Sequence, residues 1–203
     1  MAARWRRTER TGTPSDLLVV GLGNPGEKYA GTRHNVGREV VERLAARHGG
    51  RLRSAKGEVL VDSIRVDGRR VGLVFPLTYM NEAGRAVAPQ VRQNGIDDLH
   101  RLVVVHDELD LPVGRMKVKV GGGLAGHNGL KSLRDHLHSA EFVRVRIGID
   151  RPPGPTHDYV LRRPSKADRT ELDIVVETAA DAVETILTEG PEAAMARYNG
   201  AVT

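Results

Sequence analysis

The sequence predicts a single-domain α/β protein with three layers, in which helices cover both faces of a mixed, twisted sheet. Two observations predict this fold. Apolar strand segments alternate with amphipathic helical segments, which is typical of parallel strands joined by helices. One tight turn joins two further strand segments and adds an antiparallel pair. A chain of 203 residues is long enough for one sizeable core, and no stretch resembles an interdomain linker in composition.

The expected strands are short apolar segments. Leu17–Leu22 reads as a buried strand, and Leu102–Val105 is wholly apolar, which indicates a strand in the middle of the sheet. Val59–Val66 and Arg70–Phe75 flank Asp67-Gly68, a dipeptide favoured in hairpin turns. The remaining expected strands are Arg115–Val120 and Val143–Ile149.

The expected helices follow apolar residues at helical spacing. Asn35–Arg47 carries Val36, Val40 and Leu44 on one side, which indicates an amphipathic helix. Asn81 is a favourable N-cap for a helix from Glu82 to about Gln93. Two further helices are expected, at Asn128 to about Leu137 and at Lys166–Thr188.

Composition limits the class of protein. Hydrophobic residues make up 39% of the chain, and no apolar run is long enough to span a membrane. Because there is no cysteine, disulfides and thiolate chemistry are excluded, which suits a reducing compartment. The net charge of +5 allows a polyanionic partner. We therefore expect a soluble globular protein.

The N-terminal segment differs from the rest of the chain. It contains four arginines but lacks the apolar core of a secretory signal. We expect residues 1–16 to form a disordered basic tail, followed by one domain over residues 17–203.

A glycine-rich loop at residues 21–26 matches G-x-G-x-x-G and follows a predicted strand, so a dinucleotide-binding domain is the first alternative. That fingerprint needs its third glycine to open a helix. Here Pro25 precedes this glycine, Gly31 interrupts any helix that starts there, and the helical pattern begins only near Asn35. The sequence context therefore argues against dinucleotide binding.

His34 is the candidate catalytic residue. It lies just downstream of the glycine loop, in Thr32-Arg33-His34-Asn35, at the start of a predicted helix. A histidine can move a proton near neutral pH. Asp107 follows the predicted strand Leu102–Val105, where open α/β sheets place ligand-binding residues. Its carboxylate could accept the imidazole N–H and raise the basicity of His34, or it could simply serve as a helix cap or ion-pair partner.

Two other hydrolase mechanisms are open at this point. A metal-dependent hydrolase could use acidic and histidine side chains, but no local ligand spacing such as H-E-x-x-H is present. The candidate metal ligands are His106, Glu108, Asp110 and His127. A serine hydrolase is weaker still, since no serine lies in a G-x-S-x-G context. Attack by water remains, with histidine as the base and amides that stabilise an oxyanion, which suits an activated ester.

A basic segment precedes a second glycine-rich stretch. Lys117 and Lys119 alternate on a predicted strand and therefore share one face. They could be solvated charges at a strand edge, but Gly121–Gly123 lets the backbone approach a ligand closely. This combination favours an anion-binding site.

Four segments together resemble the bacterial peptidyl-tRNA hydrolases, from about Leu17 to the C-terminus. The first segment, residues 22–35, contains the glycine loop and T-R-H-N. The others are Y-M-N at residues 79–81, H-D-E-L-D at residues 106–110, and the glycine stretch that ends in H-N at residues 121–128. The resemblance implies hydrolysis of the ester between a peptidyl group and tRNA. It implies that His34 activates water and that Asp107 supports it.

The resemblance also implies residues that contact the substrate. The contacts to the peptidyl group and the 3′ end are Asn24, Tyr29, Tyr79, Asn81 and Asn128. Lys119 and Arg146 would bind the 5′-phosphate of the tRNA. No cofactor or metal is expected, and the protein would be a cytoplasmic monomer. An alternative function is RNA binding without catalysis, because some relatives of these hydrolases act as splicing factors in plastids.

Overall fold

Seven strands form one mixed sheet in the computed structural model, which describes residues 13–200. The strands are β1 (Leu17–Gly21), β2 (Arg53–Ala55), β3 (Val59–Val66), β4 (Arg69–Pro76), β5 (Leu102–Glu108), β6 (Met116–Val120) and β7 (Val143–Gly148). Their order across the sheet is β2-β3-β4-β1-β5-β7-β6. The central strands β4, β1, β5 and β7 are parallel, whereas β2, β3 and β6 pair antiparallel with their neighbours.

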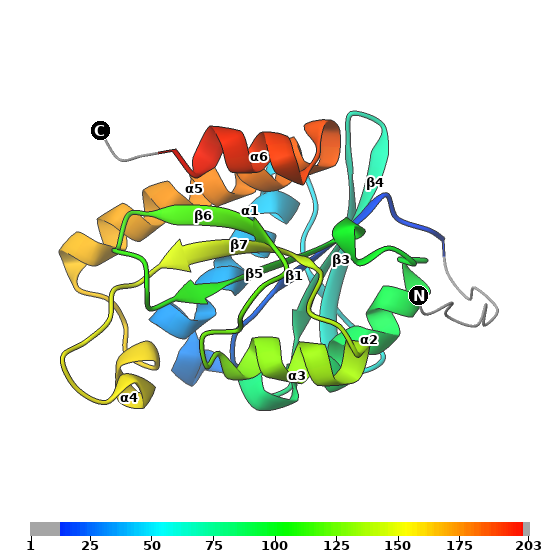
Figure 1. The fold of residues 1–203 in the computed structure, drawn as a ribbon. Coiled ribbons are helices and arrows are strands. Elements are labelled where there is room, and N and C mark those ends of the chain that lie inside the picture. The colour runs from blue at the N-terminus through cyan, green and yellow to red at the C-terminus, as the bar shows by residue number, and fades with distance from the viewer. Residues whose placement is uncertain (1–12, 201–203) are drawn as a thin grey trace.

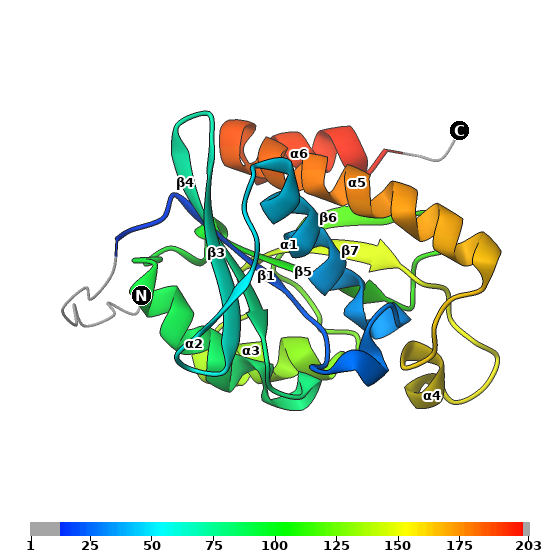
Figure 2. The same cartoon turned by 180° about the vertical axis from the view of Figure 1, so that it is seen from behind.

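Helices cover both faces of this sheet, and the predicted three-layer α/β/α fold is confirmed (Figure 1). One face carries α1 (Val36–Arg47), α5 (Lys166–Glu189) and α6 (Pro191–Tyr198). The other carries α2 (Ala83–Gln93) and α3 (Asn128–Leu137). The short helix α4 (Thr156–Val160) lies beside the start of α1, at the end of the sheet away from the β3–β4 turn (Figure 2).

The central strands are buried on both faces because their side chains alternate between two apolar cores. In β1, Leu17 and Val19 pack in the core under α1 and α5, and Leu18 and Val20 pack in the core under α2 and α3. Burying such a side chain stabilises the fold by about 1.5–3 kcal/mol. This alternation explains why the central strands are apolar without interruption.

Some elements differ from the sequence-based expectation. Asn81 does not cap α2; it lies in a 3-10 turn (Met80–Glu82) that leads into the helix, which begins at Ala83 without a side-chain cap. The strand β2 was not expected, because its three side chains are all exposed and show no apolar alternation. The helices α4 and α6 were not expected either, since five and eight residues carry too little periodicity.

The N-terminal boundary lies slightly earlier than residue 17. The Ser15 side chain is buried and its Oγ donates to Asn94 Oδ1 at 2.7 Å. The Asp16 carboxylate accepts the Arg70 N–H at 2.7 Å. These two residues therefore belong with the domain, and the predicted tail falls mainly on residues 1–12, which lie outside the described residues.

Candidate active site

The candidate site forms at the carboxyl ends of β1 and β5, where the start of α1 packs directly on the strands. Gly37, in the first turn of α1, makes this approach possible. A Cβ atom at Gly37 would lie 2.3 Å from the Val105 carbonyl oxygen, so any side chain would push the helix away. The 3-10 turn Arg33–Asn35 precedes this first helical turn and brings His34 to the end of β5.

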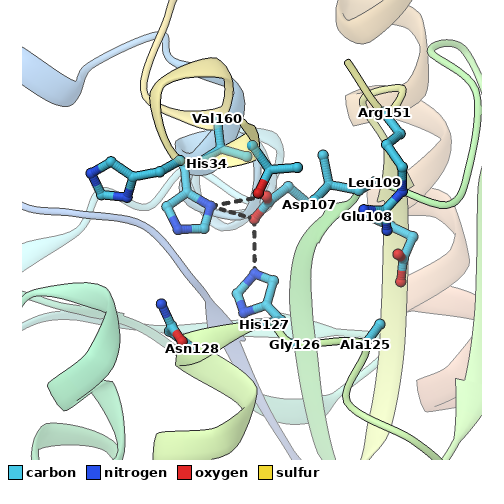
Figure 3. A pocket seen from close by; sticks show the side chains of 12 residues that line it. His34, Asp107, Glu108, Leu109, Ala125, Gly126, His127, Asn128, Arg151 and Val160 are labelled. Atoms are coloured by element: carbon cyan, nitrogen blue, oxygen red, sulfur yellow. Dashed lines mark hydrogen bonds and ion pairs between the residues drawn. The ribbon is translucent and has the colours of Figure 1, made fainter. Parts of the chain in front are cut away.

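His34 and Asp107 are in direct contact, as the sequence suggested. The Nδ1 atom of His34 lies 2.9 Å from both carboxylate oxygens of Asp107 (Figure 3). The Asp107 side chain is 3% exposed and that of His34 is 13% exposed. Because Asp107 is the acceptor, His34 carries its proton on Nδ1, and Nε2 has no protein partner among the described residues. This Nε2 lone pair can accept a proton.

His127 is a second partner of Asp107 that the sequence suggested only as a metal ligand. Its Nε2 donates to Asp107 Oδ1 at 2.9 Å (Figure 3). Its Nδ1 accepts a long hydrogen bond of 3.4 Å from the Leu130 N–H. His127 is the N-cap of α3, and both of its ring nitrogens are therefore occupied. Of the two histidines that contact the Asp107 carboxylate, only His34 has a nitrogen available for proton transfer.

The electrostatics of the site favour this division of roles. Burial alone would raise the pKa of Asp107, but His34 and His127 outweigh it and hold the pKa well below its usual range. Burial would lower the pKa of His34, but the charge and the hydrogen bond of Asp107 outweigh burial and raise the pKa. Burial and the neighbouring His127 lower the pKa of His106 to about 3, so His106 stays neutral.

The raised pKa of His34 predicts the acid limb of the pH profile. A general base works when it is neutral, so kcat/KM should rise with pH through a midpoint above the ordinary value for histidine. Asp107→Asn removes the charge that raises the pKa and should move this midpoint to lower pH while lowering the plateau. Rates measured across about pH 5 to 9 check both shifts. An unchanged midpoint in Asp107→Asn would contradict the assigned pairing.

The glycine loop after β1 is fixed by two asparagines. The Asn24 N–H donates to Asn35 Oδ1 at 2.8 Å, and Asn35 Nδ2 donates back to the Asn24 carbonyl at 2.9 Å. Asn24 Oδ1 accepts the Met80 N–H at 2.8 Å, which leaves its Nδ2 without a protein partner among the described residues. Asn35 is therefore a buried supporting residue, for which the sequence offered only its place next to His34.

A pocket of about 250 Å³ opens beside the paired side chains. It brings together three residues of the predicted site, His34, Asp107 and Asn128. His157 also lines it. The remaining predicted contacts lie outside this lining: Asn24, Tyr29, Tyr79, Asn81, Lys119 and Arg146.

These remaining residues fall into two groups. Tyr79, which is 58% exposed, and Asn81, which is also exposed, flank Met80. The Met80 N–H donates to Asn24. Tyr29 is half-buried and follows the glycine loop. Lys119 and Arg146 lie on the adjacent strands β6 and β7, on the face of the sheet that carries α3. The predicted site therefore includes the pocket beside His34 and a basic surface on β6 and β7, and Glu108, which pairs with Arg146, also lines that pocket.

The predicted metal ligands do not converge. Glu108 pairs with Arg146, Asp110 pairs with Arg151, and His106 Nδ1 donates to the Asp107 carbonyl. The group of described residues whose ligand atoms lie within 4.8 Å of one another is His34, Asp107 and His127. Those atoms already bond one another, at 2.9 Å.

Comparison with known proteins decides the family. A family model described as peptidyl-tRNA hydrolase matches residues 18–203. The chain belongs to this family. A peptidyl-tRNA hydrolase of Rhodococcus erythropolis is 50% identical over 186 residues, which cover 90% of this chain and 97% of the relative. One from Frankia alni is 47% identical over 194 residues, covering 93% and 98%.

A solved structure agrees with this assignment. The crystal structure of peptidyl-tRNA hydrolase from Acinetobacter baumannii is 34% identical, with a TM-score of 0.86, and the match covers 93% of this chain and 97% of that chain. The resemblance seen in the four sequence motifs and the predicted class of enzyme, a hydrolase, are confirmed. Among the described residues, no helix is long and apolar enough to cross a membrane.

Proposed function

We propose that the protein hydrolyses the ester between a peptidyl group and tRNA, with His34 as the general base for water and Asp107 as its support. The observation that carries this proposal is the pairing of His34 with a buried carboxylate through Nδ1, while Nε2 stays available beside a pocket. An imidazole held in one tautomer and raised in pKa suits proton abstraction from water near neutral pH.

The proposed reaction uses these groups as follows. Water attacks the ester carbonyl carbon as its proton passes to His34 Nε2, and Asp107 stabilises the imidazolium. The carboxamides of Asn81 and Asn128 donate to the oxyanion of the tetrahedral intermediate. When the intermediate collapses, the bond between the acyl carbon and the oxygen of the terminal ribose breaks. The ribose oxygen leaves and takes the proton from His34. The products are a free peptide and a tRNA with a free hydroxyl.

Substrate selection is assigned to groups around this centre. The Asn24 Nδ2 group is free to donate to a carbonyl, which a peptidyl group carries beyond its ester and a free aminoacyl group does not. Tyr79 offers an exposed ring on which a terminal base can stack, and Tyr29 offers a second aromatic surface. Lys119 and Arg146 are assigned to the tRNA 5′-phosphate.

A turnover assay on N-blocked aminoacyl-tRNA tests the proposal directly. We expect release of the N-blocked amino acid, with much slower release from free aminoacyl-tRNA. The protein dialysed against a strong chelator should keep its rate, because no step is assigned to a cation. Tight RNA binding without turnover would favour the RNA-binding alternative, and a rate restored only by zinc or manganese would favour a metal site. A monomeric state and a cytoplasmic location stay predictions.

A further inference from the structure

A second cluster of charged side chains lies on β6 and β7 of the sheet. Four basic residues of β6 and β7 share one face: Lys117, Lys119, Arg144 and Arg146. In the strand register Lys117 is opposite Arg146 and Lys119 is opposite Arg144. The residues between them, such as Val118, belong to the core under α5 on the other face. We call these four residues the basic strip.

The two arginines of the basic strip have different tasks. Arg144 is 2% exposed, and its Nη1 donates to the Gly123 carbonyl at 2.9 Å while Nη2 donates to the Gly121 carbonyl. Arg144 is therefore occupied in shaping the glycine stretch. Arg146 is partly exposed, and neither of its Nη groups has a protein partner among the described residues. Arg146 is the arginine that can reach a phosphate.

Glu108 holds the other end of the Arg146 guanidinium. Arg146 Nε donates to Glu108 Oε2 at 3.0 Å, and the Glu108 side chain is only 5% exposed. The second carboxylate oxygen of Glu108 accepts the Asp110 N–H at 3.1 Å. The carboxylate is thus fixed by the backbone on one side and holds the arginine on the other.

This arrangement suits a guanidinium prepared for an anion. An arginine bonded through Nε keeps its two outer nitrogens free for a bidentate contact with phosphate oxygens. Its long side chain is already ordered before the ligand arrives, so binding loses less rotamer entropy. A carboxylate placed only to neutralise charge would not need to be buried and bonded to the backbone.

Strand β5 links this contact to the catalytic centre. Asp107 and Glu108 are consecutive residues of the strand, and their side chains point to opposite faces. Asp107 fixes His34 on one face, and Glu108 fixes Arg146 on the other. One strand end therefore sets the position of the base and of the phosphate-binding arginine relative to each other.

We propose that Glu108 is a positioning residue for recognition of the tRNA 5′-phosphate, acting by holding Arg146. The proposal rests on the proposed function, which assigns Arg146 to that phosphate. The expected effect of removing Glu108 on tRNA binding is opposite to that of removing a simple repelling charge. An acidic side chain near a polyanion repels it, so removing such a charge strengthens binding, whereas removing a positioning carboxylate weakens it.

The test compares peptidyl-tRNA that carries a 5′-phosphate with the same tRNA after phosphatase treatment. Glu108→Ala should raise KM for the phosphorylated substrate by about threefold to tenfold, the factor expected for ordering one long side chain. Both kcat and the KM for the dephosphorylated substrate should change little. Glu108→Gln keeps an acceptor for Arg146 Nε and should show a smaller effect. Glu108→Ala should add nothing to Arg146→Ala.

Glu189→Gln is the matched control, because Glu189 also pairs with an arginine, Arg197, but on α5 and α6. It should leave both substrates unaffected. A lower KM in Glu108→Ala would identify Glu108 as a repelling charge. Equal losses on both substrates, or full additivity with Arg146→Ala, would mean a structural role. Each of these results overturns the proposal.

Binding of deacylated tRNA separates this proposal from the proposed function. If the wild-type protein bound tRNA without hydrolysing peptidyl-tRNA, the proposed function would fail on that result alone. The dissociation constants of wild type and Glu108→Ala, measured with and without the 5′-phosphate, would still test Glu108. Weaker binding of only the phosphorylated tRNA supports the positioning role, and equal dissociation constants in the two proteins refute it.

Discussion

His34→Ala is expected to lower kcat by about 10²–10⁴-fold, the usual effect of losing a positioned general base. The affinity for tRNA should stay near that of the wild type, because the assigned phosphate contacts lie on β6 and β7. The loss should be this large because His127, the other imidazole on Asp107, has both ring nitrogens occupied and cannot replace His34. Single-turnover rates on N-blocked aminoacyl-tRNA measure the effect.

His48→Ala is the matched control for this experiment. His48 follows the C-terminal end of α1, the helix whose first turn follows His34, and it pairs with Glu184 instead of Asp107. It should keep the wild-type rate. Circular dichroism of both variants shows that each is folded. If a folded His34→Ala protein hydrolysed the substrate at a near-normal rate, water activation by His34 would be wrong.

The sequence predicted the sheet well because burial on both faces leaves a clear trace. Uninterrupted apolar residues identified β1 and β5, and Asp67-Gly68 identified the hairpin, where both residues have positive φ as such a turn requires. Elements without a buried face left no such trace. The exposed strand β2 was missed for that reason, and α4 was missed because five residues carry too little periodicity.

Residues of the site could be predicted only where their place at the end of a strand points to a role. Asp107 was found because it stands at the end of a buried strand, although β5 continues through Glu108. The role of His127 depends on the packing of the α3 N-terminus against β5, which no local pattern reports. Glu108 was considered only as a candidate metal ligand, because nothing local in the sequence points to its partner Arg146, 38 residues away.

Lys119→Ala and Arg146→Ala are each expected to raise KM for full-length peptidyl-tRNA by about tenfold to a hundredfold, with little change in kcat. Hydrogen bonds to charged groups contribute about 1.5–3 kcal/mol, which corresponds to this range. Lys119 is well placed for such a contact because it lies against Gly122. A Cβ atom at Gly122 would lie 2.7 Å from Lys119 Nζ, and the positive φ of Gly122 favours glycine at this position.

The dependence on salt and on the 5′-phosphate distinguishes a phosphate contact from a general surface charge. Each phosphate contact releases about one counterion when the complex forms. Each variant loses one such contact, so its affinity should depend less steeply on salt, by about one counterion. The KM effect should vanish with a minimal substrate that has the 3′ end but no 5′-phosphate. Lys117→Ala is the comparison, since Lys117 is a basic residue on the same face of β6 to which the 5′-phosphate is not assigned. Equal losses on full-length and minimal substrates would show that Lys119 and Arg146 support the catalytic centre itself, and the assigned path of the tRNA across β6 and β7 would be abandoned.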